Sequence, residues 1–220
     1  MTTTSHDERL EVLRGSVFAV LPESELRCLA EDVGETHLLA GNLLYDPEVT
    51  IVGAGLVRVF IADGAGRQVT VSYLRAGNAI ALAHLAGRRY PTAFQAVVDS
   101  VLVVIGDDRV LGLQRSNAAL GWESARECSA RLDDIEAELA RIAFGSLQQR
   151  LAYHLLIIST ARDDMDHPVH LNDLVIAVGS SREVISRTLS PLANDGIVRV
   201  GSGGVTVTDQ RRLRKHAHLV

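Results

Sequence analysis

Apolar positions recur at steps of three and four in some stretches of the chain and at steps of two in others. Steps of three or four place side chains on one face of a helix, whereas alternation places them on one face of a strand. Residues 7–32 and 125–142 show the helical spacing, while residues 37–108 alternate between short glycine-containing turns. This pattern predicts an α+β fold.

The first half of the chain is predicted to hold helices followed by a strand-rich domain. Pro22 suits the first turn of a helix and divides the N-terminal helical stretch in two. Segments LVRVFIA (56–62) and QVTVSYL (68–74) flank a DGAG turn, which is a hairpin pattern, and residues 93–106 form a further strand-rich run. Many short strands separated by glycines predict a small barrel or β-roll.

Residues 171–187, LNDLVIAVGSSREVISR, are typical of a helix-turn-helix. Apolar residues at helical spacing precede Gly179, which supplies the turn, and either Ser180 or Ser181 can cap the next helix. Val184, Ile185 and Leu189 give that second helix a buried side. The helix therefore has the organisation of a recognition helix, whose N-terminal end enters the major groove of DNA.

The exposed side of this second helix carries side chains that can read bases. Arginine can bond both acceptors of guanine, and a carboxylate can accept a hydrogen bond from the amino group of cytosine. The residues predicted to contact DNA are Ser181, Arg182, Glu183, Ser186 and Arg187. The alternative for such charges is a solvated helix face without a ligand.

Two features after the helices support a nucleic-acid site. Residues 197–208, IVRVGSGGVTVT, predict two strands around a glycine-rich turn, which would form a wing that touches phosphates. The basic run 211–216, RRLRKH, belongs to the same end of the chain, although terminal basic runs are often merely solvated.

A heptad pattern lies between the two halves of the chain. Its apolar positions are Ala125, Cys128, Leu132, Ile135, Leu139 and Ile142. Charged residues fill the positions between them, so one stripe is apolar and the rest is solvated. The stripe can pack on the chain's own β-domain or on a second copy. We favour a parallel homodimer, because a symmetric dimer would present paired recognition helices to a palindromic operator.

Composition restricts the class of protein. The net charge of −5 combines −7 before residue 148 with +2 after it, because residues 148–220 hold nine basic and seven acidic residues. Two cysteines and eight histidines show no zinc-site spacing, so no metal site is expected. The absence of a signal-like N-terminus or a membrane-length apolar run predicts a soluble, cytoplasmic protein without a membrane partner. The sequence shows no nucleophile or phosphate cradle, and we expect no enzymatic activity.

The order of these segments resembles that of the bacterial transcription regulators that include the cyclic AMP receptor protein and the fumarate and nitrate reductase regulator (the CRP/FNR family). The most specific match is GSSREVISR, residues 179–187, which is similar to the family's recognition-helix pattern. The resemblance implies a cyclic-nucleotide-binding-like sensor domain over residues 1–110, a dimerisation helix over 111–146 and a winged helix-turn-helix over 147–220. It also implies a palindromic TGTGA-like site and, for an activator, RNA polymerase as a partner.

The expected effector pocket departs from that of the family's cyclic AMP binders. Leu82 stands where those proteins hold the ribose with a carboxylate, and Pro91-Thr92 stands where an Arg-Ser pair holds the phosphate. Positions that reach the adenine hold Ile135 and Glu136, while Arg88 or Arg89 could substitute for the missing guanidinium. A buried phosphate without its charge partner is strongly unfavourable. We therefore expect an effector that is unconventional or absent, and not cyclic AMP.

Other sensors remain as alternatives. Haem is one, because His6, His37 and His84 fall in or near the sensor domain, and oxidation of Cys128 on the heptad stripe is another. One N-terminal cysteine, Cys28, cannot hold the iron-sulfur cluster of the oxygen-sensing branch. The remaining alternative is a ligand-binding module whose winged helix docks protein instead of DNA.

Overall fold

The computed structural model describes residues 5–87, 92–161 and 168–218. The chain begins with α1 (His6–Arg14), the 3-10 helix η1 (Val17–Val20) and α2 (Glu23–Asp32). The N-terminal helical stretch therefore breaks earlier than predicted, because Gly15 ends α1 and the Ser16 hydroxyl caps η1. Pro22 is the N-cap of α2 and precedes its first turn.

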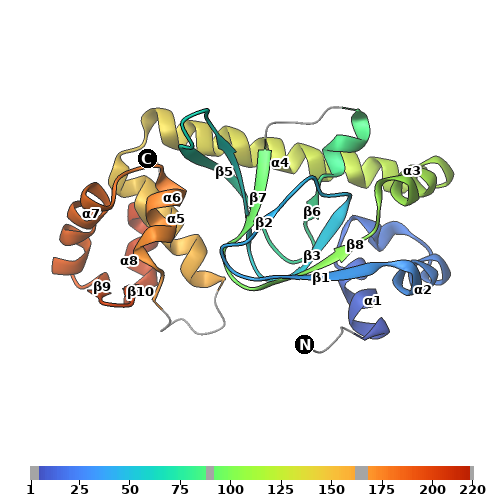
Figure 1. Cartoon of the computed structure of the whole chain (residues 1–220), viewed down its shortest axis with the longest axis horizontal. Coiled ribbons are helices and arrows are strands. Elements are labelled where there is room, and N and C mark those ends of the chain that lie inside the picture. The colour runs from blue at the N-terminus through green and yellow to red at the C-terminus, as the bar shows by residue number, and fades with distance from the viewer. Residues whose placement is uncertain (1–4, 88–91, 162–167, 219–220) are drawn as a thin grey trace. The chain divides into compact units, whose positions relative to one another are not determined.

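Short strands form two four-stranded sheets, in agreement with the predicted β-roll (Figure 1). One sheet has the order β1-β8-β3-β6 and the other β2-β7-β4-β5. The strands are β1 (Gly34–Leu38), β2 (Leu43–Leu44), β3 (Thr50–Ala54), β4 (Val57–Ala62), β5 (Gln68–Leu74), β6 (Ala79–Ile80), β7 (Thr92–Ala96) and β8 (Ser100–Val104). The 3-10 helix η2 (Leu82–Ala86) follows β6.

The segment predicted as one dimerisation helix contains two helices. Helix α3 (Asp107–Ser116) ends where Asn117 takes an extended backbone conformation, and the 27-residue α4 (Ala118–Phe144) follows. The heptad stripe falls entirely on α4. Within the described residues, no helix has the length and hydropathy needed to cross a membrane.

The C-terminal part is a winged helix-turn-helix, as predicted. Helices α5 (Leu147–Thr160), α6 (Leu171–Val178) and α7 (Arg182–Asn194) precede the antiparallel wing of β9 (Val198–Gly201) and β10 (Gly204–Val207). The basic run that follows is not a tail but a helix, α8 (Gln210–Ala217), because Asp209 caps it and Leu213 is buried.

Two compact units make up the chain. The first comprises Met1–Val59 and Ser72–Asp134, and the second comprises Phe60–Val71 and Ile135–Val220. The division falls within α4, so the last turns of that helix belong with the winged helix-turn-helix. The bounds of the three domains expected from the sequence stay a prediction.

Each unit has its own apolar core. In the first, the N-terminal helices pack with strand and α3 residues, including the fully buried Leu13, Phe18 and Ile51. In the second, Leu151, Leu155, Ile158, Leu174, Ile185, Leu189, Leu192, Ile197, Val205 and Leu213 are buried. The second core fixes α7 and the wing against α5 and α8.

Candidate DNA-binding site

Local sequence determines the turn between α6 and α7. Helix α6 ends at Gly179, whose φ of 67° lies in the left-handed region that favours glycine. Of the two candidate serines, Ser181 is the N-cap of α7, and its hydroxyl accepts a hydrogen bond from the backbone N–H of Val184. The turn and the cap together define where the recognition helix begins.

Helix α7 is amphipathic in the way that the sequence predicts. Ile185, Leu189 and Leu192 are at most 1% exposed. The opposite face is open, and all five residues predicted to contact DNA are exposed: Ser181, Arg182, Glu183, Ser186 and Arg187. The polar groups that could read bases are thus gathered at the N-terminal half of one anchored helix.

The charges on this face differ in their partners. Glu183 Oε1 lies 3.7 Å from Arg187 Nη2, and both side chains are more than 70% exposed. A pair this exposed contributes little to stability, so either side chain can exchange its partner for a base at little cost. Arg182 forms no ion pair within the part of the chain that the structure describes.

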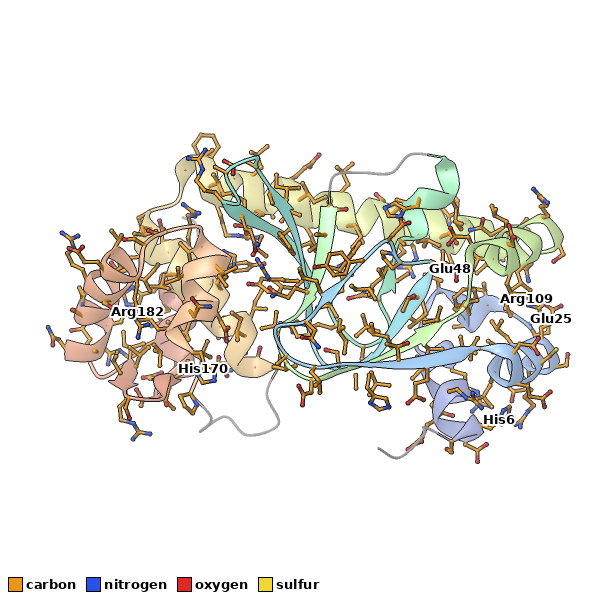
Figure 2. All side chains as sticks on the ribbon, in the orientation of Figure 1. His6, Glu25, Glu48, Arg109, His170 and Arg182 are labelled. Carbon is orange, nitrogen blue, oxygen red and sulfur yellow. The ribbon has the colours of Figure 1, made fainter. Side chains whose placement is uncertain are left out.

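A cleft of about 240 Å³ lies between the wing and the start of α6. It is lined by His170, Leu171, Asn172, Arg182 and residues 200–205. Figure 2 shows His170 and Arg182 in this part of the chain. Sequence reasoning did not single out His170, which precedes the helix-turn-helix motif, or Asn172, which lies on the first helix of that motif. The cleft combines a cation with the amino terminus of a helix, which are the groups that bind a phosphate.

The wing approaches α6 closely because of one glycine. Gly204 has a φ of 132°, and a Cβ atom there would meet the carbonyl oxygen of Val169 at 2.2 Å. That close approach allows Val169 and Val205 to form an antiparallel β-bridge. Gly204 is therefore needed both for the turn of the wing and for the contact of the wing with Val169.

Helix α8 adds a basic surface to the second unit. Arg211, Arg214 and Lys215 are exposed, and none forms an ion pair among the described residues. Arg212 has a different role, because its Nη1 donates a hydrogen bond of 2.8 Å to the carbonyl oxygen of Asp195, the C-cap of α7. One arginine thus anchors the helix and leaves the other cations open to solvent.

Most of the large apolar side chains of the heptad stripe on α4 are exposed in the described part of the chain. Cys128 packs against the core of the first unit. Beyond it, Leu132 is 54% exposed and Leu139 is 62% exposed, and Ile135 and Ile142 are also exposed. Of the stripe, only Cys128 is packed against this core among the described residues.

The residues predicted for the effector pocket lie on several elements. Leu82 in η2 is 6% exposed and belongs to the N-terminal core, while Thr92 begins β7. Ile135 and Glu136 are exposed on α4. Arg88, Arg89 and Pro91 lie outside the described residues.

Sequence reasoning missed a polar network that joins α4 to the β-roll. Arg131 Nη1 lies 2.9 Å from Asp134 Oδ2 and donates to the carbonyl oxygen of Tyr73 on β5. Ser72 on β5 donates to the same aspartate, and Asn78 donates to Glu127 of α4. The two elements are therefore held together by the protein's own side chains.

The candidate haem and redox residues are dispersed. His6, His37 and His84 lie on α1, β1 and η2, and His37 pairs with Glu35 at 2.6 Å. No group of three potential metal-ligating side chains occurs among the described residues. Burial raises the pKa of the Cys128 thiol, with a smaller contribution from Glu127, which disfavours the reactive thiolate.

Comparison with known proteins identifies the family. A family model described as the Crp-like helix-turn-helix domain matches residues 149–216. The cyclic AMP receptor protein of Thermus thermophilus is 30% identical over 179 residues, covering 80% of each chain. The cAMP-activated global transcriptional regulator Vfr of Pseudomonas aeruginosa is 24% identical over 157 residues, covering 66% of this chain and 73% of Vfr.

Solved structures support the same architecture. A transcriptional regulator of the Crp/Fnr family from Eubacterium rectale has a TM-score of 0.76 and 20% identity, covering 91% of this chain and 97% of its own. A Crp/Fnr-family regulator from Thermus thermophilus has a TM-score of 0.69 and 23% identity, covering 84% and 98%. These relatives are transcription regulators and not enzymes. The chain belongs to the CRP/FNR family of bacterial transcription regulators, with a helix-turn-helix domain that binds DNA.

Proposed function

We propose that this protein is a homodimeric, sequence-specific regulator that reads a palindromic TGTGA-like site and whose sensor domain does not respond to cyclic AMP. The observation that carries the proposal is the exposed polar face at the N-terminal half of α7, which an apolar face anchors in the core. A recognition helix needs this combination, because base reading requires open side chains on a rigid support.

Base reading is assigned to three side chains of α7. Arg182 or Arg187 would donate two hydrogen bonds to a guanine, and Glu183 would accept one from a cytosine amino group. Ser186 supplies a further contact, and Ser181 combines capping with a position at the helix start. Each good bidentate contact discriminates against a wrong base by about 1–3 kcal/mol.

The exposed stripe on α4 supports the dimer. Leu132, Ile135, Leu139 and Ile142 are large apolar side chains at heptad spacing with substantial exposure. Burying one such side chain contributes about 1.5–3 kcal/mol, so a second copy of α4 is a favourable partner. The resulting two-fold symmetry gives two recognition helices and a palindromic operator.

The polar network between α4 and the β-roll supports an effector that is unconventional or absent. Contacts of Arg131, Asp134 and Glu127 with residues 72–78 join the two elements through side chains of the protein itself. Leu82 gives no carboxylate for a ribose and is buried in the core. Haem at His6, His37 or His84, or a redox role for Cys128, remains the alternative within the same family.

The direct test measures binding of the purified protein to a duplex with a TGTGA inverted repeat, with and without cyclic AMP, and to a scrambled duplex. We expect specific binding at equal affinity in both conditions. Tightening of at least about tenfold by the nucleotide would contradict the effector assignment, because tenfold corresponds to 1.4 kcal/mol of coupling. Equal affinity for the two duplexes would contradict specific reading and favour a winged helix that docks protein.

We expect the exposed cations of α8 to contact phosphates without reading sequence. Lys215→Gln should weaken binding to the specific and the scrambled duplex alike, and reduce the slope of log affinity against log salt by about 1. Arg126→Gln, an exposed change in the first unit, is the control and should leave the slope unchanged. A salt slope that Lys215→Gln does not alter would remove α8 from the interface.

A further inference from the structure

Two titratable side chains are buried where the end of α4 meets α5. Glu138 of α4 is 4% exposed and His154 of α5 is 1% exposed. His154 Nε2 lies 3.5 Å from Glu138 Oε1. Both residues belong to the second unit, together with the winged helix-turn-helix.

Arg141 completes the contact from one helical turn further along α4. Its Nε donates a hydrogen bond of 2.7 Å to Glu138 Oε2. Its guanidinium also lies 3.7 Å from the ring centroid of Tyr153, the neighbour of His154 on α5. Two pairs of side chains therefore cross the junction of the helices side by side.

The same face of α5 is connected to the turn of the helix-turn-helix. Arg150 Nη2 donates a hydrogen bond of 2.6 Å to the carbonyl oxygen of Val178, the last residue of α6. Gly179 and the start of α7 follow immediately. A continuous set of contacts thus runs from the last turns of α4 through α5 to the start of the recognition helix.

Burying these ionisable side chains costs desolvation free energy, which an apolar contact between the two helices would not cost. Burial lowers the pKa of His154, and the hydrogen bond and charge of Glu138 oppose this effect. Burial alone would raise the pKa of the Glu138 carboxyl group. The hydrogen bonds and charges of His154 and Arg141 have the larger combined effect, so the pKa of Glu138 is lowered overall. An apolar pair of similar volume would stabilise the junction at least as well, whereas directional polar contacts specify one geometry.

We propose that Glu138 and His154 are positioning residues that fix the angle between the end of the dimerisation helix and the recognition helix. In a dimer, that angle sets the separation of the two recognition helices and hence the half-site spacing that the protein accepts. This consequence rests on the proposed function, whereas the fixed angle itself does not.

The first test compares duplexes whose half-sites are separated by the preferred spacing and by one base pair more or fewer. The wild type should prefer one spacing by at least about tenfold, since spacing follows dimer geometry. Glu138→Gln and His154→Gln should reduce that preference below about threefold while the proteins remain folded by circular dichroism. Asp133→Asn removes a charge from an exposed position of the same helix and should behave as wild type.

A second variant guards against unfolding. Replacing both Glu138 and His154 with leucine removes both members of the buried pair and leaves Arg141 its contact with the Tyr153 ring, so the fold should be retained. This folded double variant should also lose its spacing preference. Retention of the wild-type preference in any of the three folded variants would overturn the role in spacing.

The second test does not require DNA. Spin labels are placed at Ala137→Cys on α4 and Ser190→Cys on α7, with Cys28→Ser and Cys128→Ser, and labelled chains are diluted with unlabelled ones. In the parent, which is the labelled protein without further changes, pulsed electron paramagnetic resonance should give one narrow distribution of distances between the two labels. Adding Glu138→Gln or His154→Gln should at least double the width of that distribution. Unchanged widths would overturn the positioning role. If the parent binds no duplex but the widths increase, the DNA-binding proposal fails while the positioning role stands.

Discussion

Leu139→Glu is expected to convert the protein into a monomer and to weaken binding to the inverted-repeat duplex by about 100-fold or more. In a dimer, binding of one recognition helix holds the other close to the second half-site, and a monomer loses this high effective concentration. Leu139 is 62% exposed on α4 in the single chain, yet it occupies a heptad position that faces the second copy in the proposed dimer. Two glutamates would then meet in an apolar seam, where buried like charges are strongly unfavourable. Analytical ultracentrifugation and a duplex titration measure both effects.

Ala137→Glu is the matched control for this prediction. It adds the same charge to the same helix at an exposed position outside the heptad stripe. We expect that variant to remain dimeric and to bind like the wild type. A dimeric Leu139→Glu protein with unchanged affinity would show that α4 is not the dimer interface.

Arg182→Ala is expected to cost about 1–3 kcal/mol of affinity for the specific duplex, which is about 5-fold to 150-fold, and to relax preference at one base pair. Arg182 is the first residue of α7, is exposed and has no ion-pair partner among the described residues. Its removal therefore leaves no buried charge behind in the protein. Titration against duplexes with each of the four base pairs at one half-site position measures the change.

The position of Arg182 is also compatible with a phosphate contact, and the same titration distinguishes it from a base contact. The side chain also lines the cleft beside the wing, where a phosphate contact is possible. A phosphate contact would weaken specific and scrambled duplexes by the same factor, whereas a base contact weakens the specific duplex more. Equal losses would move Arg182 from the base-reading set to the backbone-contacting set. Lys215→Gln, expected to weaken both duplexes alike, provides the comparison.

Local patterns explain most of what the sequence could predict. The helix-turn-helix follows from apolar spacing, Gly179 and a serine cap, which act within a few residues of one another. The wing follows from alternation around a glycine-rich turn, and the heptad stripe follows from a sustained period. These signals require no knowledge of contacts between distant segments.

Long-range contacts explain what the sequence could not predict. Nothing near Glu138 in the sequence distinguishes it from the solvated Glu136, because its burial depends on His154, sixteen residues away on another helix. The basic run became α8 because the buried Leu213 anchors it. The network of Arg131 likewise depends on strands that lie far away in the sequence.

The proposed function requires two copies of α7 to read a two-fold symmetric sequence. The most direct measurement is selection by the purified, ligand-free protein from a pool of random duplexes, followed by sequencing of the bound fraction. We expect enrichment of an inverted repeat whose half-sites contain G·C pairs at fixed positions. Enrichment of a single unrepeated motif would contradict the dimer, and the absence of any enriched sequence would contradict base reading by α7.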